Sequence, residues 1–431
     1  MRVTITASGS RGDVQPYVAL GVGLARAGHE VTLTAPAAFG RLITDRGLAF
    51  HPVAMDPLEG VRRELEDGDA NLLRFAWRAR DILGPPATED LRAFRAACRD
   101  AEAVVYSSVG FLGFKVAGDL GIPRVGATYG PLLNPTRLFP CSFMPVSSGR
   151  LGVPERDAFG SLRGLYNRLS YPLAQQALWQ PMRVPINAAL RDEPESSPFP
   201  FSGPFGEFAR SREPVLNGWS RHVLPHPPGW APHITTTGYW FLDRPPDWRP
   251  PPNLVDFLES GPPPVSVGFG SMAGADAEGV TKLVLRALRL AGKRGVLLAG
   301  WGGLSNADLP DDLFEVGEVP HDWLFPRVAA AVHHGGAGTT AASLRAGTPT
   351  VIVPHFADQF FWGARVAGLG AGPRPAPRAK LTAERLADAI RRATGDAGRR
   401  ERARSLGEKI RAENGVERAV EAFERYARFR R

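Results

Sequence analysis

Residues 3–34 read VTITASGSRGDVQPYVALGVGLARAGHEVTLT, and this stretch decides the fold. The apolar run 3–8 predicts a buried strand, and a glycine-bearing turn follows it. A helix is expected over 14–27, because Gly28 then offers a C-terminal stop, and 30–34 predicts the next strand. Strand, helix and strand in this order indicate a βαβ unit with parallel strands.

The same alternation continues through both halves of the chain. Short apolar runs predict further strands at 103–106, 124–127, 265–269, 295–299, 329–333 and 350–353. Amphipathic stretches between them, such as 280–291, predict helices. Because 431 residues are long for a single core, we expect two doubly wound α/β domains, each built on a parallel sheet.

A proline-dense passage separates the two halves. Proline removes backbone donors, so this passage is interpreted as a semi-rigid connector and not as sheet. We expect a first domain at 1–224, a linker at 225–253, a second domain at 254–410, and a C-terminal helix at 411–431 that can return to the first domain. Ligands of such folds bind beyond the carboxyl ends of the strands, so a site is expected between the domains.

Two less regular stretches, 57–100 and 130–210, are rich in aromatic residues and proline. The aromatic residues include Phe139, Phe143, Tyr166, Tyr171, Trp179, Phe199, Phe201 and Phe205. Their side chains either pack in the core and the loops or form an apolar wall for a bulky ligand. The sequence leaves both interpretations open.

The chain carries a net charge of +8, which indicates attraction to something anionic. Its densest basic stretch, 391–431, alternates arginine with glutamate and predicts a salt-bridged helix surface. The interleaved aromatic residues of nucleic-acid modules are absent there, so nucleic acid is set aside as a partner. A weak peripheral contact with a membrane stays open.

The expected compartment is the cytoplasm. The N-terminus lacks the long apolar run of a signal peptide, and no later run is long enough to span a bilayer. Cys98 and Cys141 are too few for a disulfide framework and are expected to be free thiols.

A glycine-rich turn follows the strand at 329–333, in the sequence His333-His334-Gly335-Gly336-Ala337-Gly338-Thr339-Thr340. Small residues let the backbone approach a ligand, and the N–H groups at the start of the following helix bind a pyrophosphate. His333 is expected to donate a hydrogen bond to a phosphate oxygen. The turn matches neither the Gly-Lys-Ser/Thr loop nor the dinucleotide fingerprint, and by itself it also suits a purely structural turn.

Asp358 and Gln359 follow the next predicted strand, 350–353. A carboxylate beside an amide can accept from and donate to the vicinal hydroxyls of a sugar. Asp358 alone would also suit the cap of a helix. The two motifs at this spacing together predict a sugar-diphosphate site.

With these motifs the chain resembles the GT-B glycosyltransferases, in which a donor motif of the form His-x-Gly-x-x-Gly/Ser precedes Asp-Gln. The resemblance extends over most of the chain and is closest to the sterol-glucosyltransferase-like and antibiotic glycosyltransferase branch. The segments that carry it further are 9–16, 225–230, 238–241 and 262–272.

The resemblance implies a role for each matching position. The donor diphosphate would be held by His333, by Ser271, and by the backbone of Gly335, Gly336, Ala337, Gly338 and Thr339. The backbone of Val319 would pair with the nucleobase of the donor. Trp301 would line the nucleobase site or pack in the core. Asp358 and Gln359 would hold the sugar hydroxyls.

Asp13, in the first βα turn, is the expected catalytic base. Transfer to an alcohol needs a base, and a carboxylate in this turn faces the expected cleft. Many relatives carry His at this position. The structural alternative is that Asp13 caps the helix that begins at Val14. Arg11 would offset negative charge on the leaving diphosphate, or would only solvate the surface.

No metal site and no cofactor are expected beyond the nucleotide sugar, which is a co-substrate. One base and one leaving group predict inversion at the anomeric carbon. The expected donor is a UDP- or dTDP-sugar carrying a hexose or deoxyhexose, and the expected acceptor is a bulky apolar natural product or sterol. Two rival hypotheses are a nucleotide-sugar epimerase and a non-catalytic partner protein that binds a sugar nucleotide.

Overall fold

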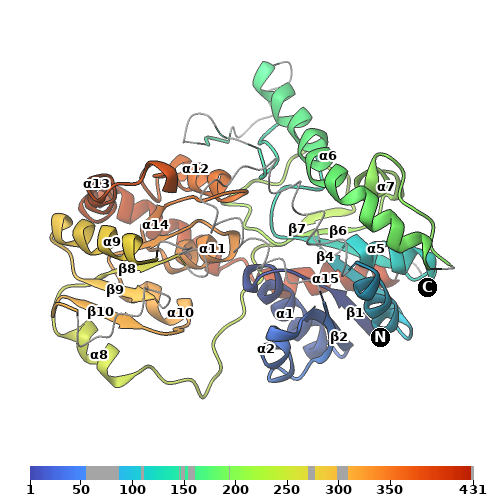
Figure 1. Cartoon of the computed structure of the whole chain (residues 1–431), viewed down its shortest axis with the longest axis horizontal. Coiled ribbons are helices and arrows are strands. Elements are labelled where there is room, and N and C mark those ends of the chain that lie inside the picture. The colour runs from blue at the N-terminus through green and yellow to red at the C-terminus, as the bar shows by residue number, and fades with distance from the viewer. Residues whose placement is uncertain are drawn as a thin grey trace.

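The computed structural model describes residues 1–54, 87–107, 111–144, 146, 151–153, 161–193, 195–269, 277–298 and 309–428. They form two parallel sheets surrounded by helices, with the second sheet and its helices on the left of Figure 1 and the first on the right. The chain is therefore an α/β protein with two doubly wound sheets, as the sequence predicts.

The first sheet has seven strands in the order β3-β2-β1-β4-β5-β6-β7. Its strands are β1 (Arg2–Thr6), β2 (Glu30–Pro36), β3 (Ala49–Val53), β4 (Ala103–Ser107), β5 (Arg124–Thr128), β6 (Val215–Asn217) and β7 (Ile234–Thr236). The helices of this part include α1 (Arg11–Arg26), α2 (Gly40–Thr44), α5 (Phe111–Asp119), α6 (Leu162–Arg191), α7 (Gly203–Ser211) and the 3₁₀ turn η1 (Ala37–Phe39), and residues 87–98 are helical as well. β1 is central and almost fully buried, which is why its sequence is a continuous apolar and β-branched run.

The second sheet has five strands in the order β10-β9-β8-β11-β12. Its strands are β8 (Val265–Gly268), β9 (Gly295–Leu298), β10 (Leu313–Val316), β11 (Ala330–His333) and β12 (Thr350–Ile352). Its helices are α8 (Pro252–Glu259), α9 (Ala277–Ala291), α10 (His321–Leu324), α11 (Ala337–Ala346), α12 (Gln359–Leu369), α13 (Ala383–Gly395) and α14 (Ala397–Arg411), with 3₁₀ turns η4 (Phe325–Arg327) and η5 (Arg378–Lys380).

The strand order of each sheet reverses at one point, between β1 and β4 in the first sheet and between β8 and β11 in the second. Ligands of doubly wound sheets bind where the order reverses, beyond the carboxyl ends of the strands. The turn after β1 holds Asp13, and the turn after β11 holds the glycine-rich motif. Helices α1 and α11, which these turns begin, contact each other.

The last helix, α15 (Gly415–Arg428), packs against α1 of the first domain. Ala419, Val420 and Phe423 are buried in the same core as β1 and β2. Gly23 of α1 allows this close approach, because a Cβ on it would lie 2.3 Å from Val416 Cγ1.

Two stretches are more regular than the sequence indicated. Residues 162–191 form the 30-residue helix α6 in spite of Pro172, Pro181 and Pro185. Buried side chains such as Trp179 anchor this helix and override the low helix propensity of proline. Strand β7 lies inside the stretch 225–253, so the interpretation of that stretch as free of sheet is wrong. β7 sits at the sheet edge, where neighbouring prolines are tolerated.

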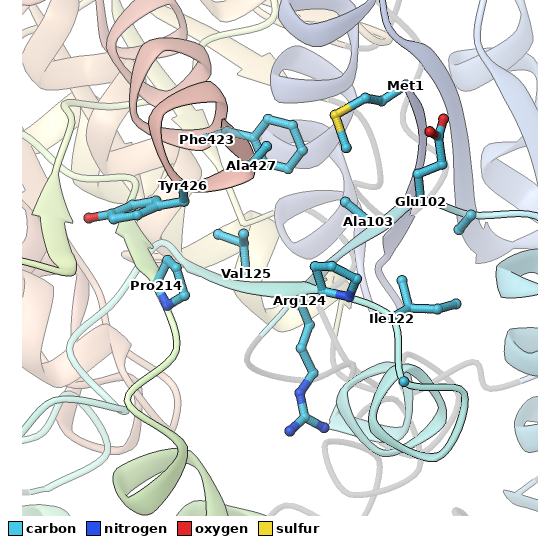
Figure 2. A pocket seen from close by; sticks show the side chains of 13 residues that line it. Met1, Glu102, Ala103, Ile122, Arg124, Val125, Pro214, Phe423, Tyr426 and Ala427 are labelled. Atoms are coloured by element: carbon cyan, nitrogen blue, oxygen red, sulfur yellow. The ribbon is translucent and has the colours of Figure 1, made fainter. Parts of the chain in front are cut away.

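A pocket of about 330 Å³ opens at the amino ends of the strands of the first sheet. The turn that holds Asp13 lies at the opposite, carboxyl ends of these strands. Figure 2 shows it between the amino ends of the strands, at Ala103 and Arg124, and the C-terminal helix, at Phe423 and Tyr426. It is therefore not the site predicted from the sequence. Among the described helices, none has the length and apolar character needed to cross a membrane.

Candidate active site

The glycine-rich turn of the second domain forms the start of α11. Gly335 has a φ of +96°, and a Cβ on it would lie 2.6 Å from Ile352 Cγ2, so both conformation and space require glycine. Gly336 is the N-cap residue of α11 and has no side chain with which to cap it. The helix thus begins with its backbone donors uncapped by its own sequence.

These donors are the N–H groups of Ala337, Gly338 and Thr339, the first three residues of α11. The first N–H groups of a helix have no partner within it, and the helix dipole places a partial positive charge there. Gly338 is exposed, and nothing lies within 4 Å of where its Cβ would be. The start of α11 therefore has both free donors and open space, as an anion site needs.

His333, which was expected to contact a phosphate, is turned inward instead. Its side chain is 2% exposed, its Nδ1 accepts from the Gly335 N–H at 3.0 Å, and its Nε2 lies 3.5 Å from Ser343 Oγ. Burial lowers the pKa of His333 well below its usual range, so the ring is neutral. The expected hydrogen bond to phosphate is therefore wrong in this structure, and His333 instead holds the turn from within.

His334 takes the other side of the chain, because successive residues of an extended strand point to opposite faces. Its Nδ1 is buried without a hydrogen-bond partner among the described residues. Its Nε2 lies 2.6 Å from where a Cβ on Gly336 would be, so the ring sits directly beside the N-cap of α11. Burial lowers its pKa to about 4, so it too is neutral. No role was predicted for His334 from the sequence, although alternation along the strand places its side chain opposite that of His333.

Asp358 lies at the N-cap position of α12, but its side chain does not cap the helix. Its Oδ2 accepts from the indole N–H of Trp362 at 2.9 Å. Burial raises the pKa of Asp358 to about 7, with the charge of Asp13 adding to the effect and the Trp362 hydrogen bond opposing it. The side chain of Asp358 is thus held by Trp362 of its own helix.

The loop before α12 is held by Gln359 and carries strain. The side-chain oxygen of Gln359 accepts from the backbone N–H of His355 at 2.7 Å and of Phe356 at 3.3 Å. Its NH₂ group is then the part that could donate to a sugar hydroxyl. Ala357 has a φ of +51°, a left-handed conformation that non-glycine residues rarely adopt.

Asp13 is fixed by its own turn. Helix α1 begins at Arg11, earlier than the sequence predicted, so Asp13 lies in its first turn. Its Oδ2 accepts from the Ser10 N–H at 2.8 Å and from the Ser10 hydroxyl at 2.6 Å. Gly9 has a φ of +111°, and a Cβ on it would lie 2.8 Å from the same oxygen. The capping alternative is thus correct for one carboxylate oxygen, with Ser10 and not Asp13 as the N-cap.

Tyr129 holds the other oxygen of Asp13. Its hydroxyl donates to Asp13 Oδ1, and its ring meets Tyr17 edge-on with the centroids 6.3 Å apart. Burial, with the charges of Asp13 and Asp358 adding to it, raises the pKa of Tyr129 well above its usual range. The hydroxyl therefore stays protonated and remains a donor. No sequence motif pointed to Tyr129, which directly follows β5.

Arg11 does not stand free at the start of α1. It donates to Glu318 at 2.7 Å and to Gln15 at 3.2 Å. Glu318 directly precedes Val319, whose side chain is buried between β10 and α10. Arg11 thus joins the first domain to the loop of Val319, which is expected to hold the nucleobase of the donor. In this structure Arg11 pairs with the carboxylate of Glu318.

Two family models match the chain. Residues 3–83 match the glycosyltransferase family 28 N-terminal domain, and residues 302–423 match the C-terminal domain of erythromycin biosynthesis protein CIII-like proteins. The chain is 38% identical to O-mycaminosyltylonolide 6-deoxyallosyltransferase of Streptomyces fradiae, over 100% of this chain and 98% of that protein. The chain belongs to the glycosyltransferases.

This glycosyltransferase is also 36% identical to a sterol 3-beta-glucosyltransferase of Candida albicans, over 98% of its own length. It spans only 27% of that longer relative. Among solved structures, the glycotransferase of kitacinnamycin superposes with a TM-score of 0.69 at 20% identity, covering 99% of this chain and 98% of that chain. The likeness to that structure shows a shared GT-B fold.

Two predicted donor-site residues of the glycosyltransferase, Ser271 and Trp301, lie outside the described residues. In the part of the chain that the structure describes, no group of three or more His, Cys, Asp or Glu side chains could hold a metal ion.

The aromatic residues considered for an acceptor wall divide into two groups. Five are buried in the core, namely Phe139, Tyr171, Trp179, Phe199 and Phe205. Phe143 is half-buried, and Tyr166 and Phe201 are exposed. Plain packing is therefore correct for the first five, and residues 57–86 of the other stretch lie outside the described part.

Proposed function

We propose that this glycosyltransferase moves a hexose or deoxyhexose from a UDP- or dTDP-sugar to a hydroxyl of a bulky apolar acceptor, with inversion and without a metal. One observation carries the proposal: α1, which carries Asp13 in its first turn, contacts α11, whose first N–H groups are uncapped, and α11 contacts α12, which follows Asp358. A base, a sugar-binding carboxylate and an anion site thus meet where the two domains touch. The relatives, named for glucosyl transfer to sterols and 6-deoxyallosyl transfer, support the sugar and acceptor classes.

The reaction follows from these positions. The acceptor oxygen attacks the anomeric carbon while its proton passes to Asp13. The bond from that carbon to the diphosphate oxygen breaks, and its electron pair leaves with the diphosphate. The N–H groups of residues 337–339 and the dipole of α11 stabilise the charge that develops there. Attack opposite to the leaving group inverts the anomeric carbon.

Asp13 suits the role of base because its turn leaves it little freedom. Ser10 holds one oxygen and Tyr129 the other, so the carboxylate is oriented before substrate binds. Such positioning contributes to catalysis by avoiding reorganisation in the transition state. Proton transfer to a positioned base accounts for about 10²–10⁴-fold in rate.

The remaining donor contacts belong to the same proposal. His334 would contact the diphosphate, and Asp358 with the NH₂ group of Gln359 would bind the sugar hydroxyls. Val319, Ser271 and Trp301 keep the roles that the family pattern implies, as does the division into an acceptor domain at 1–224 and a donor domain at 254–410. Cys98 and Cys141 are buried free thiols, which supports a cytoplasmic location.

The test uses purified protein with a panel of UDP- and dTDP-sugars and apolar alcohols, and NMR to assign the anomer of the product. Asp13→Asn should lower kcat about 10²–10⁴-fold. Asp45→Asn, at an exposed carboxylate after α2, is the matched control and should retain activity.

Three other outcomes would contradict the proposal. Full activity of Asp13→Asn would refute the assignment of the base. An epimerised nucleotide sugar without glycoside would show an epimerase. Donor binding without turnover across the acceptor panel would show a non-catalytic binding protein.

A further inference from the structure

The first three turns of α6 carry an exposed apolar face. Its members are between 45% and 86% exposed and form what we call the apolar stripe: Leu162, Leu165, Tyr166, Leu169 and Leu173. Figure 1 shows this end of α6 standing out at the top of the molecule. Exposed large apolar side chains occur singly on most surfaces, but a continuous row of them marks an interaction site.

The stripe is ordered along the helix. At about 100° per residue its five members fall within an arc of about 100°, and they extend along about 16 Å of the axis. The opposite face of the same turns, with Tyr171 and Ala174, is buried in the core of the first domain. The helix is thus already anchored through one face, and the stripe is a second apolar face that stays exposed.

Positive charge borders the stripe on both sides. Arg163 and Arg168 are exposed and lie at about +100° and −120° from the middle of the stripe. Arg163 also donates to the Gly152 carbonyl at 2.8 Å, which keeps its guanidinium near the start of the helix. The whole of α6 contains no aspartate or glutamate.

The stripe ends where the helix gains partners. One turn beyond Leu173 the same face carries Gln176 and then Gln180, which donate to the carbonyls of Ser202 at 3.1 Å and Phe201 at 3.0 Å. The sequence therefore changes from leucine to glutamine where another segment covers the helix. The five residues of the stripe all precede the part of the helix that this segment covers.

We infer that the apolar stripe is a docking surface for an anionic lipid bilayer. An apolar arc bordered by arginine, without acidic residues, is the pattern of a helix that lies in a membrane interface, with its leucines at the acyl boundary and its guanidinium groups at the phosphates. A second copy of the chain fits less well, because a two-fold stripe-to-stripe contact would bring the arginines of both copies together. The inference goes beyond the proposed function and does not depend on it.

The test is flotation of the purified chain with vesicles of phosphatidylcholine alone or with 30% phosphatidylglycerol, at low and high salt. Binding should require phosphatidylglycerol and should weaken as salt rises. Arg163→Glu with Arg168→Glu should weaken binding at least about 20-fold, and Leu165→Ser with Leu169→Ser at least about tenfold.

Two matched controls separate the stripe from general charge and apolar exposure. Arg26→Glu with Arg41→Glu makes the same charge change on another exposed surface, and Leu290→Ser removes a leucine that is 46% exposed on α9. Both should bind like the parent chain, and circular dichroism should show that every variant is folded. Failure of the parent chain to float with anionic vesicles overturns the inference. So does a dimer in sedimentation that the leucine variants dissociate, since the stripe would then join two copies.

Discussion

Helices α1 and α11 begin in the same place in their sheets, but the start of α1 carries a carboxylate and the start of α11 carries open N–H donors. Each follows a central strand through a glycine turn, at the point where the strand order of its sheet reverses. At α1, Ser10 and Asp13 form a capping box in which the Asp13 carboxylate accepts from the Ser10 N–H and hydroxyl, so the turn carries its own negative group. At α11 the N-cap is Gly336, without a capping side chain, so the donors stay open.

The difference teaches how one βα unit serves two roles. A helix start capped by its own sequence can hold a negative side chain in place, which suits a base. A helix start that lacks a cap is less stable by itself, but it leaves N–H groups for an anionic ligand. The presence or absence of a carboxylate in the first turn thus separates the two helix starts.

The largest change in the free energy of unfolding is expected at a third helix start, that of α12. Asp358 lies at the N-cap position of this helix without capping it. Its pKa is raised to about 7, so the folded state favours the protonated carboxyl. Ionisation of Asp358 should therefore take away stability as pH rises from about 4 to 7, by at most about 4 kcal/mol. Asp358→Asn cannot ionise, so it should be inactive yet more stable than wild type above pH 7.

Urea unfolding at pH 4, 5.5 and 8 measures this difference. The advantage of Asp358→Asn should vanish near pH 4, and Asp45→Asn should differ from wild type by less than about 0.5 kcal/mol at every pH. A constant difference between Asp358→Asn and wild type across the range would contradict the prediction.

The difference between α1 and α11 should disappear when α11 also carries a carboxylate in its first turn. Gly338→Asp places a carboxylate where a Cβ meets open space, so the fold should be unharmed. The charge would repel the donor diphosphate and should raise the donor Kd at least about 10²-fold. Gly338→Ala is the control for size and should have a much smaller effect. Isothermal titration with nucleoside diphosphate measures both, and equal affinities would argue against an anion site at α11.

Tyr129→Phe tests how the carboxylate of Asp13 is positioned at the start of α1. Loss of the hydroxyl frees one oxygen of Asp13, and kcat should fall about tenfold, as for a lost hydrogen bond to a charged group. Tyr17→Phe is the matched control, since its hydroxyl donates to the Ala127 carbonyl and its ring packs against Tyr129. It should lower stability but change kcat less than twofold. If both variants lose kcat equally, packing and not the hydrogen bond positions Asp13.

The smallest effect concerns the strained loop before α12. Ala357→Gly removes the penalty of a left-handed alanine and should raise the free energy of unfolding by about 1 kcal/mol. Ala346→Gly, at the last residue of α11, should lower it by up to about 1 kcal/mol. Thermal unfolding of both variants gives the comparison, and a loss of stability in Ala357→Gly would show that this conformation carries no strain.

The sequence predicted the sheets better than the long helix. Buried parallel strands such as β4 and β11 read as short apolar runs, so their positions agree with the structure to within about a residue. Helix α6 was missed because its prolines argue against a helix, whereas its stability comes from buried contacts of residues such as Trp179 and Tyr171. Tertiary packing of this kind leaves little trace in local sequence.

The site was predictable where backbone geometry defines it. The open start of α11 follows from its glycines, and the conformation of Gly335 requires that residue. The expectation for His333 failed because the motif does not show that its ring is buried and accepts from the Gly335 N–H. Tyr129 was missed because it meets Asp13 only after β1 and β5 are placed on either side of β4.

The return of α15 to the first domain also sets the order in which the chain can mature. The core around β1 is complete only when Ala419, Val420 and Phe423 are in place, and these residues leave the ribosome about 400 residues after β1. Until then the face of α1 at Gly23, against which Val416 packs in the finished fold, lacks its partner. The nascent first domain must therefore wait for its last structural piece, while the second domain can close its sheet earlier.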